Sequence, residues 1–230
     1  MKISLVIPAH NEEKRIKKVL ELYISYFSKN YSEYEIIVIC DGYDDTAKIV
    51  RNISNKNNYI NLFKFTTKLG KGGGIIEGFK RVTGEIIGFI DADGSVNPSD
   101  FGKLITELEK VDCAIASRRL FESKITKKHP LKRRVSSRVF NILVNIMFGL
   151  GIKDTQCGAK VFKKDVIKKV LPKIKSRGFE FDVELLWRIK REGFLIKEVP
   201  IEWQHKDGST FSLKYAPEMF VNLLKRRFGK

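Results

Sequence analysis

Short apolar runs alternate with longer amphipathic segments along the first half of the chain. The apolar runs, rich in Ile and Val, predict five strands at residues 3–7, 35–40, 60–65, 85–90 and 113–116. The segments between them carry apolar residues at helical spacing and predict helices at residues 12–27, 45–53, 73–82 and 99–109. Because strands that alternate with helices form right-handed βαβ units, we expect an α/β fold with a Rossmann-like, mostly parallel sheet flanked by helices.

The character of the chain changes after residue 118. Residues 118–138 include nine basic residues and a single acid, Glu122. We expect a helix next, and the pattern beyond it predicts helices at residues 164–171, 181–191 and 213–228 and a strand at residues 195–203. Neither a repeat nor a linker interrupts the sequence, so we expect a single domain over residues 1–230.

Charge narrows the classes of partner. Lys and Arg number 44 against 27 Asp and Glu, which gives a formal net charge of +17. Such a field favours polyanionic partners: nucleic acid, an anionic membrane surface or phosphorylated substrates. Neither zinc-ligand spacing nor an aromatic RNA-binding strand accompanies the charge, so we expect no nucleic-acid partner.

The cysteines and the N-terminus indicate a cytosolic setting. Cys40, Cys113 and Cys157 are far apart and lack metal-ligand spacing, so we expect three reduced, structural thiols. The N-terminus enters a strand directly, and we expect no signal peptide. The longest apolar stretch, residues 139–152, contains two asparagines and is too short to span a bilayer.

Two carboxylates follow the fourth predicted strand, in Asp91-Ala92-Asp93-Gly94. The crevice at the carboxyl ends of the strands is where open α/β sheets bind ligands. Paired carboxylates at that place suit a divalent cation that carries a diphosphate. The sequence therefore predicts a Mg²⁺ or Mn²⁺ site at Asp91 and Asp93.

The other strand ends offer further polar or flexible groups to the same edge. The first strand runs into Pro8-Ala9-His10-Asn11-Glu12, and the second into Asp41-Gly42, whose carboxylate can hold a base or a ribose hydroxyl. The loop at residues 68–74 is rich in glycine but lacks the spacing of a Walker loop or a Rossmann fingerprint. Its glycines still allow close approach of the backbone to a ligand, and Lys71 can reach a phosphate.

Taken in order, these motifs resemble a known family. They are Ile7-Pro8-Ala9-His10-Asn11-Glu12-Glu13, Asp41-Gly42, Gly70-Lys71-Gly72, Asp91-Ala92-Asp93 and Asp154-Thr155-Gln156-Cys157-Gly158. The ordered set is similar to the family 2 inverting glycosyltransferases of the GT-A fold, in particular the dolichyl- and polyprenyl-phosphate mannose and glucose synthases. The resemblance covers almost the whole chain and implies a hexosyltransferase that depends on a metal.

The resemblance assigns roles residue by residue. It divides the domain into a nucleotide-sugar half, residues 1–95, and an acceptor half, residues 96–230. The expected nucleotide-binding residues are Pro8, Ala9, Asn11, Glu12, Asp41, Lys71, Asp91 and Ala92. The expected catalytic residues are Asp93, Arg118 and Asp182. Asp91 and Asp93 match the family's DxD motif, in which the acids engage ribose and the metal that bridges the diphosphate.

The basic second half suits a lipid-phosphate acceptor. A polyprenyl phosphate is already largely ionised at neutral pH and needs cationic positioning rather than a general base. The acceptor-phosphate candidates are Arg133, Arg134, Arg138, His205 and Lys206, the last two in a loop expected to close over the donor. A hydroxyl acceptor would instead require a base, for which Asp182 and Glu184 are candidates.

One helix face supports an acceptor at a membrane. Arg134, Arg138, Asn141 and Asn145 form one helical stripe, and apolar residues cover much of the remainder. This pattern is typical of an interfacial helix at lipid headgroups, although a core helix would show it too. We expect a peripheral protein on the cytoplasmic face of the membrane, and recruitment by a membrane protein stays open.

Three departures from the family pattern leave the donor open. Cys40 stands where many members have a second Asp, Tyr43 where Ser is frequent, and Ser95 where mannose synthases often have a Gln metal ligand. UDP-glucose and GDP-mannose both fit, and the segment at residues 154–158 favours the glucose synthases slightly. The alternative function is a family 2 transferase that extends a glycan or polysaccharide hydroxyl.

Overall fold

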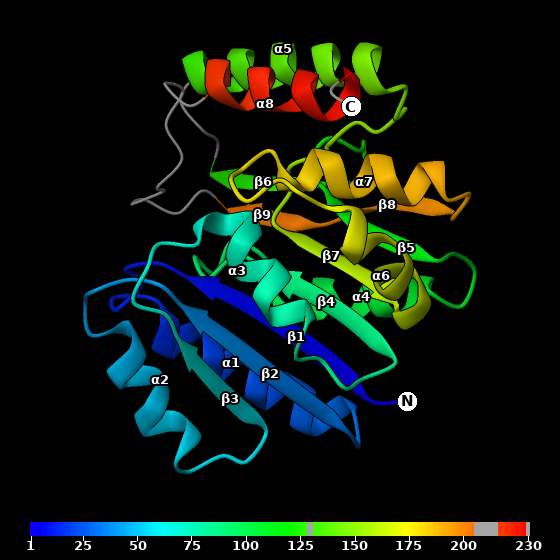
Figure 1. Ribbon diagram of the computed structural model, residues 1–230. Coiled ribbons are helices and arrows are strands. Elements are labelled where there is room, and N and C mark those ends of the chain that lie inside the picture. The colour runs from blue at the N-terminus through cyan, green and yellow to red at the C-terminus, as the bar shows by residue number, and fades with distance from the viewer. Residues whose placement is uncertain (128–130, 205–215, 229–230) are drawn as a thin grey trace.

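The strands of the computed structural model fall into two sheets (Figure 1), and the structure describes residues 1–127, 131–204 and 216–228. The larger sheet contains β1 (Ile3–Ala9), β2 (Tyr34–Cys40), β3 (Ile60–Lys64), β4 (Ile86–Ile90), β5 (Cys113–Ser117), β7 (Ala159–Lys163) and β8 (Ile196–Pro200). Their spatial order is β3-β2-β1-β4-β7-β5-β8. The smaller sheet pairs β6 (Lys124–Lys127) with β9 (Glu202–Gln204).

One strand of the larger sheet runs against the others. β7 is antiparallel to β4 on one side and to β5 on the other, whereas the remaining neighbours pair in parallel. The expected α/β architecture with a mostly parallel sheet is confirmed. The antiparallel direction of β7 was not part of that expectation. Strands from residues 1–95 and from residues 96–230 share the one sheet.

Helices cover both faces of the larger sheet. The helices are α1 (Ile16–Asn30), α2 (Thr46–Ser54), α3 (Gly70–Phe79), α4 (Pro98–Glu107), α5 (Leu131–Phe148), α6 (Lys164–Val170), α7 (Phe181–Arg191) and α8 (Ala216–Phe228). Side chains from α1, α2 and α4 join one core, and side chains from α3, α6 and α7 join the other. α5 and α8 form an outer layer beyond α7 (Figure 1), where the guanidinium of Arg227 of α8 lies 5.9 Å from the ring centroid of Phe148 of α5.

The two cores follow from the alternation of side chains along the strands. In β1, Ile3, Leu5 and Ile7 enter the core with α1, whereas Val6 enters the core with α3. Successive residues of a strand face opposite sides of a sheet, so a strand covered on both faces is apolar throughout. The three cysteines are buried and free, which confirms them as structural thiols.

The predicted elements of the first half are confirmed, with shifted ends. In the second half the sequence pattern missed β6 and β7, and it merged β8 and β9 into one strand. Ile201 separates β8 from β9. β8 pairs with β5 in the larger sheet, whereas β9 lies outside that sheet and pairs with β6. The closing helix was expected from residue 213, and residues 205–215 lie outside the described part of the chain. No helix in the described ranges combines the length and hydropathy needed to cross a bilayer.

The packing of α3 on β1 generates a stability prediction. A Cβ added at Gly78 would lie 2.2 Å from Cγ1 of Val6, a fully buried side chain. We expect Gly78→Ala to lower the free energy of unfolding, because overpacking costs about 1–3 kcal/mol and outweighs the ~1 kcal/mol gain in helix propensity. Thermal and denaturant unfolding measure the loss.

The matched control removes the methyl groups that the new Cβ would meet. In a Val6→Ala background, Gly78→Ala should cost less than it does in the native chain, because the two sites are coupled through direct contact. Equal costs in the two backgrounds would contradict the packing argument.

Candidate functional site

The carboxyl ends of the parallel strands bring polar residues to one edge of the sheet. β1 ends before His10, β2 before Asp41, β4 before Asp91 and β5 before Arg118. β7 runs the opposite way, so the loop at residues 154–158 reaches the same edge before that strand begins. This edge is where open α/β sheets bind ligands, and it collects the polar groups predicted at the strand ends.

Asp41 joins the ends of the first two strands to α3. Its Oδ1 lies 2.9 Å from Nδ1 of His10. Its Oδ2 accepts hydrogen bonds from the backbone N–H of Leu69, at 2.7 Å, and of Gly70, at 3.2 Å. The carboxylate therefore fixes the start of α3, the helix that carries Lys71, as well as the turn after β1.

Asn11 shapes the turn after β2. It has a positive φ of 57°, a conformation that asparagine tolerates better than most residues. Its Oδ1 accepts hydrogen bonds from the backbone N–H of Tyr43, at 3.0 Å, and of Asp44, at 3.4 Å. A Cβ at Gly42 would lie 2.4 Å from that oxygen, so this turn requires glycine.

Glu12 is buried near the two acids of the DxD motif. Its Oε2 lies 2.6 Å from Nη2 of Arg15, and its backbone N–H donates to Oγ1 of Thr46 at 2.7 Å. Burial raises the pKa of Glu12 above its usual range, against the opposing effect of Arg15, and the charges of Asp93 and Asp91 add to the rise. The three carboxylates therefore share one electrostatic site.

The predicted apolar nucleotide contacts lie partly in the core. Ala9 and Ala92 are 1% and 4% exposed and pack in the core on the α1 side of the sheet. Only the backbone of these two residues can meet a nucleotide. Pro8 is half-buried, and its Cβ lies 3.0 Å from the position of a Cβ on Gly74 of α3.

Asp91 has protein groups against both carboxylate oxygens. Nζ of Lys71 lies 3.0 Å from Oδ1. A Cβ on Gly158 would lie 2.0 Å from Oδ2, and the backbone N–H of Asp91 donates to the carbonyl of Gly158 at 2.9 Å. Burial raises the pKa of Asp91, Lys71 opposes that rise, and the neighbouring Asp93 adds to it.

Asp93, like Asp91, is half-buried. Its Oδ1 accepts the backbone N–H of Ser95 at 2.8 Å. Oγ of Ser95 is buried and lacks a hydrogen-bond partner among the described residues. No cluster of three or more His, Cys, Asp or Glu side chains able to hold a metal occurs in the described part of the chain. Two carboxylates and a nearby hydroxyl fit a Mg²⁺ or Mn²⁺ whose other ligands come from a diphosphate and water.

Asp182 lies beneath this pair, between two lysines. Its Oδ2 lies 2.9 Å from Nζ of Lys71, and its Oδ1 lies 2.6 Å from Nζ of Lys160. Burial alone would raise the pKa of Asp182, but the ion pairs with Lys160 and Lys71 outweigh it and leave the pKa below the usual range. A buried carboxylate with both oxygens paired is a poor proton acceptor.

Glu184, the second candidate base, is also fully buried and paired. Its Oε2 accepts hydrogen bonds from the backbone N–H of Lys175, at 3.1 Å, and of Ser176, at 2.8 Å. Its Oε1 lies 3.2 Å from Nη2 of Arg188. The interpretation of Asp182 and Glu184 as free bases at the start of α7 does not fit this geometry, because each carboxylate holds other parts of the protein.

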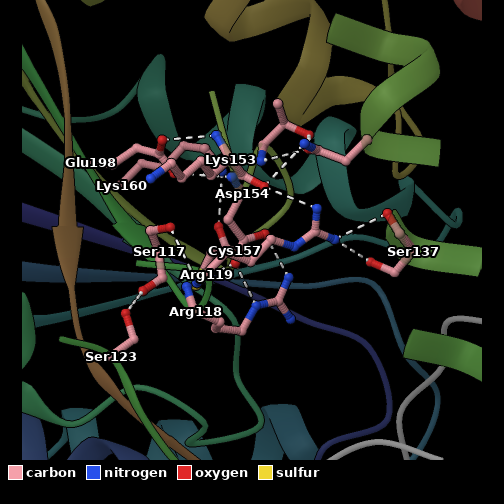
Figure 2. A network of polar contacts seen from close by, with 12 residues as sticks. Ser117, Arg118, Arg119, Ser123, Ser137, Lys153, Asp154, Cys157, Lys160 and Glu198 are labelled. Carbon is pink, nitrogen blue, oxygen red and sulfur yellow. Dashed lines mark hydrogen bonds and ion pairs between the residues drawn. The ribbon is translucent and has the colours of Figure 1, made fainter. Parts of the chain in front are cut away.

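Arg118 lies against the loop that precedes β7 (Figure 2). Its Nε and Nη2 lie 2.7 Å and 2.8 Å from the two oxygens of Asp154, and its backbone N–H donates to the same carboxylate at 2.9 Å. Its guanidinium also lies over the ring of Trp203, at 5.4 Å from the centroid. Burial would lower the pKa of Arg118, but Asp154 raises it above its usual value.

Arg119 connects the same loop to α5. Its Nη1 donates to the carbonyl of Lys153 at 2.9 Å, and its Nη2 donates to Oγ of Ser137 at 2.8 Å, as Figure 2 shows. The backbone N–H of Asp154 donates to Glu198 of β8 at 2.9 Å. The loop before β7 is therefore held from β5, α5 and β8 together.

The predicted polar stripe of α5 is divided between protein and solvent. Nδ2 of Asn141 donates to the carbonyl of Ile152 at 3.0 Å, and Oγ1 of Thr155 donates to Asn141 at 2.8 Å. Asn145 also bonds Ile152. The two asparagines therefore satisfy backbone groups of the loop, as the alternative of a core helix implies, and do not face lipid headgroups.

The outer face of α5 is apolar. Ile146 is 78% exposed, and it continues a row of exposed apolar residues at helical spacing: Val135, Val139, Ile142 and Leu143. Arg138, which is exposed, and Arg134, which is half-buried, lie on the same helix. Arg133 lies in the first turn of α5, but its side chain is outside the described part of the structure, as are His205 and Lys206.

Two functional candidates escaped the sequence analysis. Lys160 was passed over because β7 was not recognised, although a lone lysine between apolar neighbours in Ala159–Lys163 is a signal for a paired buried charge. Arg119 was counted only as part of the basic segment. Its contact with Ser137 could not be predicted, because the two residues are far apart in the sequence.

Comparison with known proteins agrees with this architecture. The model of glycosyl transferase family 2 matches residues 4–171. A dolichyl-phosphate beta-glucosyltransferase from Trichomonas vaginalis is 33% identical over 235 residues, which cover 97% of this chain and 72% of that protein. The dolichyl-phosphate beta-glucosyltransferase of Saccharomyces cerevisiae is 34% identical, over 92% of this chain and 69% of its own length.

Solved structures resemble the fold at lower identity. Glucosyl-3-phosphoglycerate synthase from Mycobacterium tuberculosis, crystallised with Mn²⁺ and uridine-diphosphate-glucose, superposes with a TM-score of 0.74 at 18% identity. The match covers 98% of this chain and 79% of that one, and it confirms the GT-A fold. The family expected from the strand-end motifs is confirmed as well: this chain belongs to glycosyl transferase family 2.

Proposed function

We propose that this enzyme transfers a hexose from a nucleotide sugar to a polyprenyl phosphate, such as dolichyl phosphate, at the cytoplasmic face of a membrane. The donor is UDP-glucose or GDP-mannose, and the names of the relatives favour glucose. The observation that carries the proposal is the exposed apolar face of α5, next to Arg134 and Arg138. A transferase with a water-soluble acceptor has no evident use for such a face.

The donor would bind across the carboxyl edge of the sheet. The nucleoside would lie over Pro8, Ala9, Asn11 and Glu12, with the turn at Asp41 beside it. Lys71 would face the diphosphate or the sugar from the first turn of α3. Asp93, together with Asp91, would hold the Mg²⁺ or Mn²⁺. That cation, when bound, would supply positive charge to the departing diphosphate.

The acceptor side needs positive charge more than it needs a base. In an inverting transfer, the acceptor oxygen attacks the anomeric carbon opposite the departing diphosphate. A phosphate monoester is largely dianionic at neutral pH, with a second pKa of about 6. We propose that five basic residues position the acceptor phosphate: Arg133, Arg134, Arg138, His205 and Lys206. Arg118, paired with Asp154, would act on the donor side as part of a fixed cationic wall.

The membrane surface itself is the proposed docking partner. An apolar helix face with basic residues beside it binds an interface through apolar burial together with attraction to anionic lipids. The cytoplasmic leaflet carries a negative surface potential, which a protein of charge +17 meets favourably.

Transfer to a glycan hydroxyl is the second candidate. That reaction requires a general base near the anomeric carbon. The two carboxylates considered for that role, Asp182 and Glu184, are buried and paired, which favours the lipid phosphate.

The central experiment offers radiolabelled UDP-glucose and GDP-mannose, each with Mn²⁺, to polyprenyl phosphate in detergent. We expect label from one donor, UDP-glucose first, to enter a lipid-extractable product that mild acid releases. Label that enters only a water-soluble glycan when a mixture of oligosaccharides is supplied would contradict the proposal and favour the second candidate.

The proposed metal site generates a second prediction. Asp93→Ala should reduce turnover by about 100- to 1,000-fold, because it removes a carboxylate from the place where leaving-group charge is stabilised. It should leave the melting temperature near the native value, since Asp93 is half-buried and, within the described residues, its carboxylate accepts a hydrogen bond from its own turn. Steady-state assays with varied Mn²⁺ and thermal unfolding measure the two effects.

The control for Asp93→Ala is Asp165→Ala, which removes an exposed acid at the start of α6. It should retain native turnover and native metal dependence. If Asp93→Ala keeps native turnover, Asp93 has no part in the reaction.

The basic start of α5 generates a third prediction. Reversing the charge of Arg133 and Arg134 to Glu should weaken binding to vesicles that contain phosphatidylserine and polyprenyl phosphate by at least about tenfold, because each basic residue near an anionic surface contributes about 1 kcal/mol. Binding of UDP or GDP, measured by calorimetry, should change little. Vesicle flotation gives the first quantity.

The matched control reverses Lys17 and Lys18, two exposed lysines of α1, which lies at the opposite end of the molecule from α5 (Figure 1). This variant has the same net charge and should keep native vesicle binding. Equal losses in the two variants would mean that only total charge matters, and equal loss of nucleotide and vesicle binding would rule out an acceptor-side role.

A further inference from the structure

Lys160 places a positive charge in the middle of the sheet. Its side chain is fully buried in β7, and its neighbours across the strands are Phe89 of β4 and Ile115 of β5. Nζ of Lys160 lies 2.6 Å from Asp182 and 2.9 Å from the carbonyl of Cys157. A lysine is rarely buried so completely, and here its charge is paired with a carboxylate.

Asp182 links Lys160 to the carboxyl edge of the sheet, where we propose that the donor binds. Its second oxygen lies 2.9 Å from Nζ of Lys71, and that same ammonium lies 3.0 Å from Asp91. The four residues form a row, Lys160–Asp182–Lys71–Asp91, from the buried centre of the sheet to the carboxyl edge. The ammonium groups of Lys160 and Lys71 both lie over the ring of Phe89, at 5.3 Å and 5.7 Å from its centroid.

Stability alone does not explain this arrangement. Charged groups lose their hydration when they are buried, and well-packed apolar residues of similar volume are often as stable as a buried ion pair or more so. An apolar residue at position 160 would continue the strand pattern of Val161 and Phe162. Core packing alone therefore does not account for a charge at this position.

We propose that Lys160 and Asp182 are positioning residues that fix the ammonium of Lys71 toward Asp91 and the donor. Lys160 occupies one oxygen of Asp182, so the other oxygen is left as a single fixed anchor for Lys71. Lys71 is thereby held beside Asp91, instead of moving freely as a surface lysine does. The inference rests on the proposed use of this edge for a nucleotide sugar, and it assigns Asp182 to positioning rather than to proton transfer.

The test removes the distant end of the row. Lys160→Met replaces a buried cation whose contacts are with Asp182 and with the carbonyl of Cys157. We expect the dissociation constant of UDP-glucose with Mn²⁺, measured by calorimetry without acceptor, to rise about 10- to 100-fold, because small misplacements of positioned groups have effects of that size. Affinity for UDP alone should change less than affinity for the sugar nucleotide.

The matched control is Arg188→Met. It removes the cation beside Glu184, a buried carboxylate on the same helix two residues beyond Asp182. Both variants are measured well below their melting temperatures. We expect them to lose stability to a similar degree, with donor binding changed only by Lys160→Met. Native donor binding by folded Lys160→Met would overturn the proposal.

A double-mutant cycle separates positioning from proton transfer. In a Lys71→Met background, Lys160→Met and Asp182→Asn should produce little further loss of donor affinity or of turnover, because they act through a group that is already absent. A large further loss of turnover with Asp182→Asn in that background would identify Asp182 as a reacting group and overturn the proposal.

These outcomes are independent of the acceptor. If polyprenyl phosphate is not glycosylated, the proposed function fails, but the effect of Lys160→Met on the binding of UDP-glucose still decides the positioning proposal. GDP-mannose replaces UDP-glucose throughout if the native enzyme binds only that donor.

Discussion

The reversal of β7 is the constraint on which the rest of the site depends. β7 lies between β4 and β5 and is antiparallel to both, so the loop before it starts at the carboxyl edge. That loop brings Asp154 to Arg118 and packs Gly158 against Asp91. A parallel strand in the same place would enter the sheet from the opposite edge, and the residues before it would lie far from the two acids.

Charge in this molecule is organised differently inside and outside. Within the described residues, the deeply buried acids of α7 and of the loop before β7 each have a cation at ion-pair distance: Asp154 has Arg118, Asp182 has two lysines, and Glu184 has Arg188. Buried charges of this kind are strongly destabilising if one partner is lost. The excess positive charge therefore belongs to the surface, where it acts as a long-range field on anionic partners.

The sequence predicted the elements that follow from local hydrophobic pattern, and it missed those that depend on contacts between residues far apart in the chain. The apolar runs located β1, β2 and β4, and the acids at their ends marked the edge of the sheet correctly. β7 was missed because its short run contains Lys160, whose partner lies on α7 and cannot be read from spacing. The partners of Asn141 could not be identified for the same reason, since Ile152 and Thr155 belong to a loop without periodicity.

Helix α5 connects the two sides of the proposed reaction. Asn141 and Asn145 hold residues 152–155 against the inner side of α5, and Arg119 joins the same loop to Ser137. The outer side of α5 is the apolar face that we propose to meet the membrane. The same loop ends at Gly158, in contact with Asp91. A helix that lies on lipid would thus be tied by side-chain hydrogen bonds to the floor of the donor site. The distance between a lipid phosphate and the donor would then be set by protein contacts rather than by chance encounters along the surface.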